Sequence, residues 1–386
     1  MIPLSYTIRN LMSHKVTTLL TVLGISLVVF VFSGSLMLSS GLRKTLVSTG
    51  TDGNVIAVRK ASQTEVMSIV PYDQAQIVRA LPEIASDENG ELLYTNEVYV
   101  LIALPNRESG EDANVVVRGV TDMSFRLRPN VKLIEGRLWR DEGSEIIAGK
   151  SAAQRFTGCG LGEKVRFGMR EWTVVGIFDA EGSGFDSELW GEINQMSDAF
   201  RRPIYSSLTF RLADTARLPS LVEKIENDRR LALDVKTEKD YYAAQSRTMS
   251  TLIRVAGSAI SIIFSLGAIV GAMITMYAAV AGRIREIGTM RSLGFSQFSI
   301  SVSFLFESLV ISLAGGLTGL LVAYFLRFLR VSTTNWDTFS EIAFNFNMSP
   351  GIALSGLLFA LLMGLAGGFL PAVRAARLNI IDSLRA

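Results

Sequence analysis

The sequence predicts an α-helical membrane domain of four transmembrane helices, with a mixed α+β extracytoplasmic domain inserted between helices 1 and 2. Three observations predict this fold class. Apolar residues make up 49% of the chain, and they are concentrated in four long runs that are almost free of charge. Between the first and second runs, residues 43–250 carry charges throughout and most of the prolines. Positive side chains gather beside the apolar runs, although the formal net charge is only +2, which gives no indication of a nucleic-acid partner.

The N-terminal part of the chain predicts an interfacial helix followed by a membrane anchor. Leu4 and Ile8 recur at helical spacing within residues 1–15, which we interpret as a cytoplasmic helix lying on the membrane surface. Residues 16–42 carry no charge and far exceed the 7–15 apolar residues of a signal-peptide core, so they predict an uncleaved first span. The flanking Lys15 places the start of the chain in the cytoplasm.

Residues 43–250 predict a mixed α+β domain outside the cytoplasm. β-Branched runs bounded by Gly, Asn, Pro or charges predict strands at NVIAVRK, EVYVLIAL, NVVVRGV and REWTVVGIF. Helices are predicted at YDQAQIVRAL, SDAFRRP and ARLPSLVEKIENDR. We expect a strand-rich subdomain at about residues 115–185, and a helix over residues 239–254 that continues directly into the next span.

Three further spans complete the membrane domain. They are predicted at residues 251–281, 298–326 and 352–371, with a short extracytoplasmic loop at 327–351. Four spans return the tail, residues 372–386, to the cytoplasm, in agreement with its excess of arginine. Each of these spans carries two glycines four residues apart, which allows close helix packing in lipid: Gly267 with Gly271, Gly315 with Gly319, and Gly364 with Gly368.

A basic segment, GRIREIGTMRSLGFSQ at residues 282–297, separates the second and third spans. It contains three arginines and one acid, namely Arg283, Arg285, Arg291 and Glu286. The positive-inside rule therefore places it in the cytoplasm.

The same segment has the spacing of a short helix that ends at a glycine. Ile287, Met290 and Leu293 fall on one face, which we expect to enter a groove on another protein, and Gly294 would close the helix. The alternative is a solvated turn whose arginines only fix the topology.

Glu307 is the one ionisable residue well inside a predicted span. Such a charge must face protein or water, or be protonated, because it is costly in lipid. A proton relay would need a partner at similar depth, and the other spans contain none. A packing or interface role is therefore favoured.

Neither nucleotide binding nor hydrolysis is predicted for this chain. The segment Gly143–Ser151, GSEIIAGKS, has five residues between its glycines, whereas a phosphate-binding P-loop has four. The chain's one histidine, His14, lies on the cytoplasmic side, so the large domain cannot hold a Ser-His-Asp triad or a histidine-ligated zinc.

The remaining candidates for chemistry have simpler explanations. The carboxylate pairs Asp141 with Glu142 and Glu181 with Asp186 are typical of solvated loop charges. The single cysteine, Cys159, cannot form an internal disulfide and is expected to be a small buried residue.

Motifs along the whole chain resemble those of the MacB/FtsX-type (type VII) ABC transporter permease family. The first span begins with IRNLMSHKVTTLLTVLGI, the cytoplasmic segment reads REIGTMRSLGFS, the third span reads FESLVISLAGGLTG, and the tail reads PAVRAARLNIIDSLRA. GRLWRDEGSEIIAGKSAAQRF and LGEKVRFGMREWTVVGIF resemble the MacB-like periplasmic domain. Ile380 departs from the proline that the family often has.

The resemblance implies a permease subunit of the inner (cytoplasmic) membrane with both termini in the cytoplasm. Two permease copies, identical or paralogous, would pack together in the lipid. Two ABC ATPase subunits, which bind ATP and Mg, would dock on residues 282–297; no cofactor is expected in this chain. Closing of the ATPases would move the periplasmic domains by mechanotransmission and drive export or extraction of a cargo, with a periplasmic adaptor or a lipoprotein as a further partner. The residues expected to carry the coupling are Arg283, Arg285, Glu286, Gly288, Arg291 and Gly294.

Two alternatives belong to other classes of function. An FtsX-like regulator would use the same movement to activate an extracytoplasmic enzyme such as a cell-wall hydrolase. A membrane-anchored enzyme is disfavoured by the absence of a histidine from the large domain.

Overall fold

The computed structural model describes residues 15–140 and 143–379. The predictions for the interfacial helix, for Asp141 with Glu142 and for the end of the tail from Ile380 lie outside the described residues. The chain forms two compact units. The membrane unit contains residues 15–40, 251–329 and 346–379, and the head unit contains residues 41–250 and 330–345.

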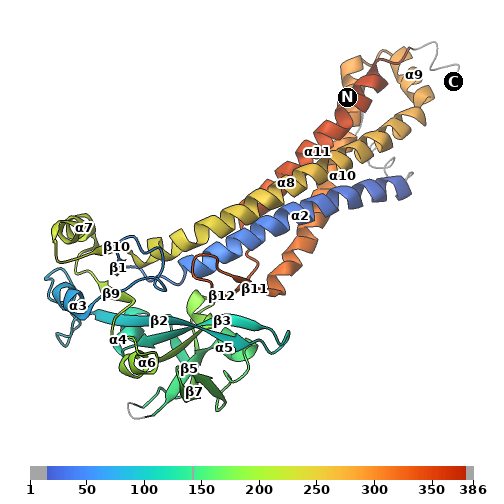
Figure 1. Ribbon diagram of the computed structural model, residues 1–386. Coiled ribbons are helices and arrows are strands. Elements are labelled where there is room, and N and C mark those ends of the chain that lie inside the picture. Colours follow the sequence, from blue (N-terminus) through green and yellow to red (C-terminus); the bar gives the residue numbers. More distant parts are fainter. Residues whose placement is uncertain (1–14, 141–142, 380–386) are drawn as a thin grey trace. The chain divides into compact units, whose positions relative to one another are not determined.

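Four long helices confirm the predicted membrane spans. They are α2 (Lys15–Val47), α8 (Glu238–Ala281), α10 (Gln297–Phe325) and α11 (Pro350–Ala376), and each is long and apolar enough to cross a membrane. Within the membrane unit they run alongside one another (Figure 1). The expected helix over residues 239–254 is confirmed as the first part of α8.

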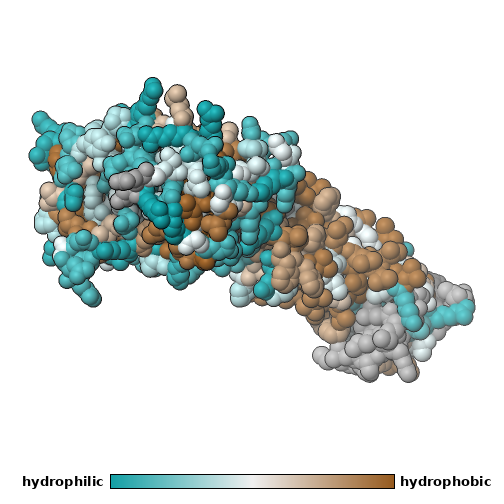
Figure 2. Space-filling model, turned by 90° about the horizontal axis from the view of Figure 1, so that it is seen from below, coloured by the Kyte–Doolittle hydropathy of each residue, from teal (hydrophilic) through white to brown (hydrophobic). Residues whose placement is uncertain are grey.

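The outer surface of these helices is apolar. Leu27, Ile263 and Leu362 are each more than half exposed, and the helices are largely brown in Figure 2, where brown marks hydrophobic residues. Such surface is stable only against lipid or against other apolar helices.

The head unit is built on one ten-stranded sheet in the order β10-β1-β9-β2-β3-β8-β5-β7-β4, with β6 paired to β7. Its strands are β1 (Asn54–Arg59), β2 (Tyr94–Pro105), β3 (Asp112–Val120), β4 (Lys132–Gly136), β5 (Glu145–Gly149), β6 (Lys164–Phe167), β7 (Arg170–Asp179), β8 (Glu188–Glu192), β9 (Ser207–Arg211) and β10 (Leu233–Thr237). Most neighbours are antiparallel, whereas β3 with β8 and β5 with β7 are parallel. The predicted α+β class is therefore confirmed, and the strand-rich segment from residue 115 onward is continuous with the rest of the sheet through β2 and β3.

Short helices join the strands of the head. They are α3 (Tyr72–Arg79), α4 (Met123–Leu127), α5 (Lys150–Arg155), α6 (Ile193–Ala199) and α7 (Leu218–Asn227), with 3-10 turns η1 (Gly184–Ser187) and η2 (Thr215–Arg217). The helix predicted at SDAFRRP lies earlier, because the Glu192 carboxylate caps α6 by accepting bonds from the backbone of Asn194 and Gln195.

The head has apolar packing on both faces of its sheet. Val78 of α3 and Leu221 of α7 pack on β1 and β9, and Trp172 lies in a second cluster with Phe156. A third cluster joins β1, β5 and β8 to the first turn of α8 through Trp190.

The segment predicted as a short loop at residues 327–351 contains structure that the sequence did not suggest. After the turn η3 (Leu326–Phe328), it forms an antiparallel hairpin of β11 (Arg330–Thr334) and β12 (Glu341–Asn345). The hairpin belongs to the head unit, although α10 and α11 on either side of it belong to the membrane unit.

Candidate coupling element

The basic segment between the second and third spans forms a short helix, α9 (Ile284–Ser292). It ends in a Schellman motif, in which the amide of Gly294 donates to the carbonyl of Arg291 at 3.1 Å and the amide of Phe295 donates to that of Met290 at 3.1 Å. Gly294 has a φ of +93°, a conformation that a residue with a side chain rarely adopts. The segment is therefore a capped helix with a sharp turn, and the alternative of a plain solvated turn is wrong.

The apolar face of α9 is covered by the chain's own helices. Ile287 is completely buried and lies in a cluster with Val280 of α8, Phe304 of α10 and Ala375 of α11, and Met290 packs on the same cluster. Only Leu293 of the predicted docking face is exposed, at 73%. The prediction that Ile287 enters another protein is wrong, and Met290 is half-buried against the same cluster, since a helical periodicity shows which face is apolar and not what covers it.

A buried ion pair fixes the start of α9 to the third span. Both terminal nitrogens of the Arg283 guanidinium donate to Glu307, at 3.0 Å and 3.1 Å. The two side chains are only 8% and 6% exposed, and the Phe304 ring lies 5.8 Å from the guanidinium carbon. Such a bidentate pair holds both groups in one orientation and satisfies charges that lipid could not solvate.

Sequence reasoning found Glu307 and Arg283 but did not connect them. The sequence predicts a coupling role for Arg283, and the other spans offer no partner for Glu307. The partner comes instead from the residue just before α9. Arg283 is thus buried and bonded inside the membrane unit.

The opposite side of α9 is polar and accessible. Arg285 and Glu286 are exposed, and so is Thr289 one turn later. Arg291 is half-buried, whereas Gly288 is buried on the packed side. Of the residues predicted to carry coupling, Arg285 and Glu286 therefore lie where another protein could touch them, and Arg283 and Gly288 lie inside.

Small residues bring α10 against α2 in the membrane unit. A Cβ added to Gly319 would lie 2.5 Å from the backbone oxygen of Ser26, and one added to Gly315 would lie 2.9 Å from the side chain of Ile25. Since contacts this short do not occur, any larger residue at either position would push α10 away from α2.

Two other glycines bring α11 against α10. Gly364 and Gly368 lie against Ser312 and Ser308, and the Ser308 hydroxyl donates to the Gly364 carbonyl at 2.5 Å. The third pair differs, because no other helix of the described chain lies within 4 Å of a Cβ built on Gly267 or on Gly271.

The segment that resembles a P-loop has a structural role in the head. It forms β5 and the start of α5, and the Lys150 ammonium donates to the Asp179 carboxylate at 2.7 Å. A Cβ on Gly149 would lie 2.4 Å from the backbone oxygen of Asp186, so this glycine serves the close packing of two backbone segments.

The remaining candidates in the head are also structural. Asp186 accepts bonds from the amides of Ala180 at 2.6 Å and Gly182 at 2.8 Å, which closes a turn. Cys159 is fully buried, and burial raises the pKa of its thiol to about 12, so it stays protonated and unreactive. Among residues 15–140 and 143–379, no group of three or more His, Cys, Asp or Glu side chains could hold a metal ion.

Two family descriptions match the chain in succession. Residues 18–228 match the MacB-like periplasmic core domain. Residues 258–380 match the FtsX-like permease C-terminal family. Together these matches include α2, most of the head, α9, α10 and α11.

Individual proteins match along nearly the whole chain. The uncharacterized ABC transporter permease YknZ of Bacillus subtilis (strain 168) is 25% identical over 98% of this chain and 97% of its own length. The macrolide export ATP-binding/permease protein MacB of Vibrio parahaemolyticus is 25% identical over 96% of this chain, which spans only 58% of that relative.

Among solved structures, the periplasmic region of MacB from Actinobacillus actinomycetemcomitans is similar, with 15% identity, a TM-score of 0.37, and coverage of 52% of this chain and 95% of that one. The chain belongs to the family of MacB/FtsX-type ABC transporter permeases.

Proposed function

We propose that this chain is the membrane subunit of an ABC transporter and that separate ATPase subunits, which bind ATP and Mg, dock on α9. Closing of the ATPases moves α9, the movement passes along the spans, and the head moves outside the cytoplasm. In this proposal two copies of the chain, or one copy and a paralogue, work with two ATPases at the inner (cytoplasmic) membrane. The result is export or extraction of a cargo that does not cross a channel through the spans.

The observation that supports this proposal best is the way α9 is held. Its apolar side is packed among three helices, and Arg283 at its start is bonded to Glu307 in the third span. A push on the exposed side, at Arg285 and Glu286, would therefore move the spans instead of bending a loose loop. Rigid elements with satisfied backbone groups transmit such displacement with little loss.

The composition of the spans also supports a role in transmitting movement, and not in conducting a cargo through a channel. Apart from the balanced pair of Arg283 with Glu307, the buried residues of the membrane unit are apolar or are small residues such as glycine, serine and threonine. A polar channel needs lining groups that replace the water of its cargo.

Charge reversal at the exposed side of α9 tests the docking of the ATPase. We expect Arg285→Glu combined with Glu286→Arg to reduce co-purification of the ATPase and ATP turnover by the complex, while insertion into the membrane is unchanged. The control is Arg230→Glu, which reverses a 69% exposed arginine of the head. Unchanged co-purification and turnover in the α9 variant would refute docking at this helix.

Thiol labelling tests the proposed topology. In a Cys159→Ala background, single cysteines at Leu293 of α9 and at Glu108 of the head should react with an impermeant reagent from opposite sides of the membrane. Both positions are exposed. Labelling of both from the same side would contradict the proposal.

A further inference from the structure

Three segments that link the head to the membrane helices meet at one place in the head unit. They are the end of α2, the start of α8 and the hairpin β11–β12. A Cβ on Gly50, just after α2, would lie 2.5 Å from the backbone nitrogen of Lys239 in α8. A Cβ on Gly41 would lie 2.1 Å from the backbone oxygen of Asn345 at the end of β12. At both positions the backbones of the two linking segments are in direct contact. One segment therefore cannot shift past the other without a steric clash.

A cluster of buried charged side chains, which we call the Arg118 cluster, lies at this meeting place. Its six members are 0–8% exposed: Arg118, Arg128, Glu65, Glu97, Glu188 and Glu238. Arg118 of β3 donates to Glu65 at 2.8 Å, to Glu97 at 2.8 Å and to Glu188 at 2.7 Å. A single guanidinium thus joins β2, β3, β8 and the loop after β1.

The same cluster holds the first residue of α8. Glu238 accepts a bond from Arg128 at 2.9 Å, from the side chain of Asn54 at 3.0 Å and from the amide of Thr51 at 2.9 Å. One turn later, the Tyr242 hydroxyl lies 3.5 Å from Glu65. Buried charge-assisted bonds of this kind fix a helix end more firmly than apolar contacts alone.

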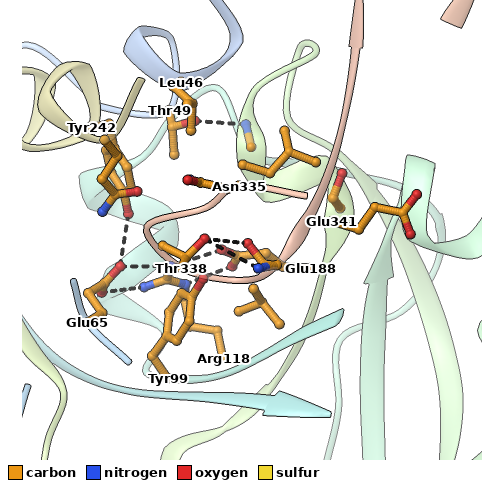
Figure 3. Close-up of a pocket in the computed structure, with 16 residues that line it drawn as sticks. Leu46, Thr49, Glu65, Tyr99, Arg118, Glu188, Tyr242, Asn335, Thr338 and Glu341 are labelled. Carbon is orange, nitrogen blue, oxygen red and sulfur yellow. Dashed lines mark hydrogen bonds and ion pairs between the residues drawn. The ribbon is translucent and has the colours of Figure 1, made fainter. Parts of the chain in front are cut away.

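The cavity at the centre of this meeting place is small. Figure 3 shows Thr49, Tyr242 and Asn335, one from each linking segment, around it with Arg118 of the sheet. Its volume is about 20 Å³, which suits a single water molecule. A drug-sized cargo would need a cavity of about 300–1,000 Å³, so the place is a joint and not a cargo site.

The hairpin is bound to the head by polar contacts of its own. Arg155 of α5 forms an ion pair with Glu341 of β12 and donates to the Ser332 hydroxyl of β11 at 2.6 Å. At the tip, the Asn114 amide donates to the backbone oxygen of Phe339 at 2.9 Å. Arg155 thus touches both strands of the hairpin, and its side chain is only 24% exposed.

We propose that Arg155 and Glu341 clamp the hairpin to the head, so that movement of α10 and α11 enters the head through this clamp as well as through α2 and α8. This inference rests on the proposed function, because it assigns a second route to the same transmitted movement. Arg155 and Glu341 act as positioning residues: they hold the hairpin in place and touch neither cargo nor nucleotide. Without the clamp, the hairpin would keep only its other contacts with the head, such as the bond of Asn114 to Phe339, and would be held less firmly.

Hydrogen exchange tests the clamp itself in the full-length protein. We expect the amides of residues 330–345 to exchange about tenfold faster in Glu341→Gln than in the wild type, since a charge-assisted bond is lost. The control is Glu171→Gln, which removes the ion pair of Glu171 with Lys164 on the exposed edge of β6 and β7. The swap Arg155→Glu with Glu341→Arg should restore slow exchange. Unchanged exchange in Glu341→Gln would overturn the clamp.

A distance measurement tests transmission through the clamp. A spin label at Glu108→Cys, in the Cys159→Ala background, reports the separation of two heads in the complex with its ATPase. We expect ATP to change this distance in the wild type, in the control and in the charge swap, and to change it much less in Glu341→Gln, with ATPase co-purification retained. An equal change in Glu341→Gln would overturn this inference and leave the proposed function standing. No change in the wild type would refute both.

Discussion

The two units of the chain bury charged side chains in different ways. Among the described residues, the membrane unit buries one arginine and one carboxylate, Arg283 with Glu307, and their charges balance. The head unit buries two arginines among four carboxylates in the Arg118 cluster. The Arg118 cluster therefore carries an excess of two negative charges if all six groups are ionised.

This difference follows from the surroundings of each unit. Lipid cannot solvate an unbalanced charge, so only a closed pair is stable within the spans. The head is surrounded by water and can balance its cluster by taking up protons. Accordingly, burial raises the pKa of Glu188, and the nearby Arg118 offsets this only in part. For Glu97, burial would also raise the pKa, but Arg128 and Arg118 outweigh burial and lower it.

The largest effect is expected from removing the centre of the Arg118 cluster. Arg118→Met leaves the buried carboxylates Glu65 and Glu188 without their arginine partner and leaves Glu97 with Arg128 alone, and breaking a buried pair typically costs about 3–5 kcal/mol. We expect the head to unfold at much lower denaturant concentration, or to fail to fold. All four tryptophans, Trp139, Trp172, Trp190 and Trp336, lie in the head unit. Tryptophan fluorescence of the full-length protein therefore measures this unit alone.

An exposed arginine of the head provides the matched control. Arg126 pairs with Asp87 and Glu91, but its side chain is 50% exposed. Arg126→Met should change the free energy of unfolding by at most about 1 kcal/mol. If the two variants lose similar stability, the Arg118 cluster is no more important than a surface ion pair, and the comparison between the units fails.

A somewhat smaller effect is expected in the membrane unit. Arg283→Met leaves Glu307 buried without its partner, at a cost of about 3–5 kcal/mol that protonation of the carboxyl would reduce. We expect lower thermal stability in detergent, followed by the loss of helical circular dichroism. Co-purification of the ATPase should also fall, because α9 loses its bond to the third span.

A double substitution separates stability from coupling. Arg283→Met with Glu307→Leu removes both charges, and replacing a buried pair by apolar groups is often neutral for stability. We therefore expect the double variant to be as stable as the wild type but still weak in ATPase-coupled turnover. Full turnover in the stable double variant would show that the pair serves folding only.

Much of the membrane unit could be predicted from the sequence, because length and charge determine a span. The prediction of four membrane helices and of a helix over residues 239–254 that continues into the second span is confirmed. The sequence does not predict what covers the apolar face of α9. The periodicity of Ile287 and Met290 is the same whether a partner protein or the chain's own helices pack on that face. The bond between Arg283 and Glu307 joins residues far apart in the sequence, so no local pattern could reveal it.

The head was less predictable for related reasons. β11 and β12 have five residues each and no β-branched run long enough to stand out, so the sequence predicts a loop where the structure has a hairpin. The Arg118 cluster did leave a signal, because Arg118 interrupts one predicted strand and Glu97 begins another. A charge on the buried face of a strand requires a partner, but the sequence alone does not say which of many acids provides it.

The smallest expected effect is the pH dependence of the head, because it depends on the uptake of single protons. The folded-state pKa of Glu188 lies above its ordinary value of 4.5, so the folded head binds more protons than the unfolded chain in the window just above pH 4.5. Stability should therefore rise as the pH is lowered from 7 into this window. Below pH 4.5 stability should instead fall as the pH is lowered further. The pKa of Glu97 is lowered in the folded state, so the stability that its carboxylate contributes is lost as the pH falls through this lowered pKa.

Glu188→Gln tests this assignment, since the amide resembles the protonated acid and cannot titrate. The variant should lose most of the rise in stability above pH 4.5 while keeping the fall below it. Asp186 also has a pKa raised by burial, so Asp186→Asn is the matched comparison, and it should remove only its own part of the rise. Denaturant unfolding of the full-length protein, followed by tryptophan fluorescence at several pH values, measures the stability of both variants. If the Glu188→Gln profile matches the wild type, the excess negative charge is balanced elsewhere, and the contrast between a balanced pair in the spans and a proton-balanced cluster in the head is wrong.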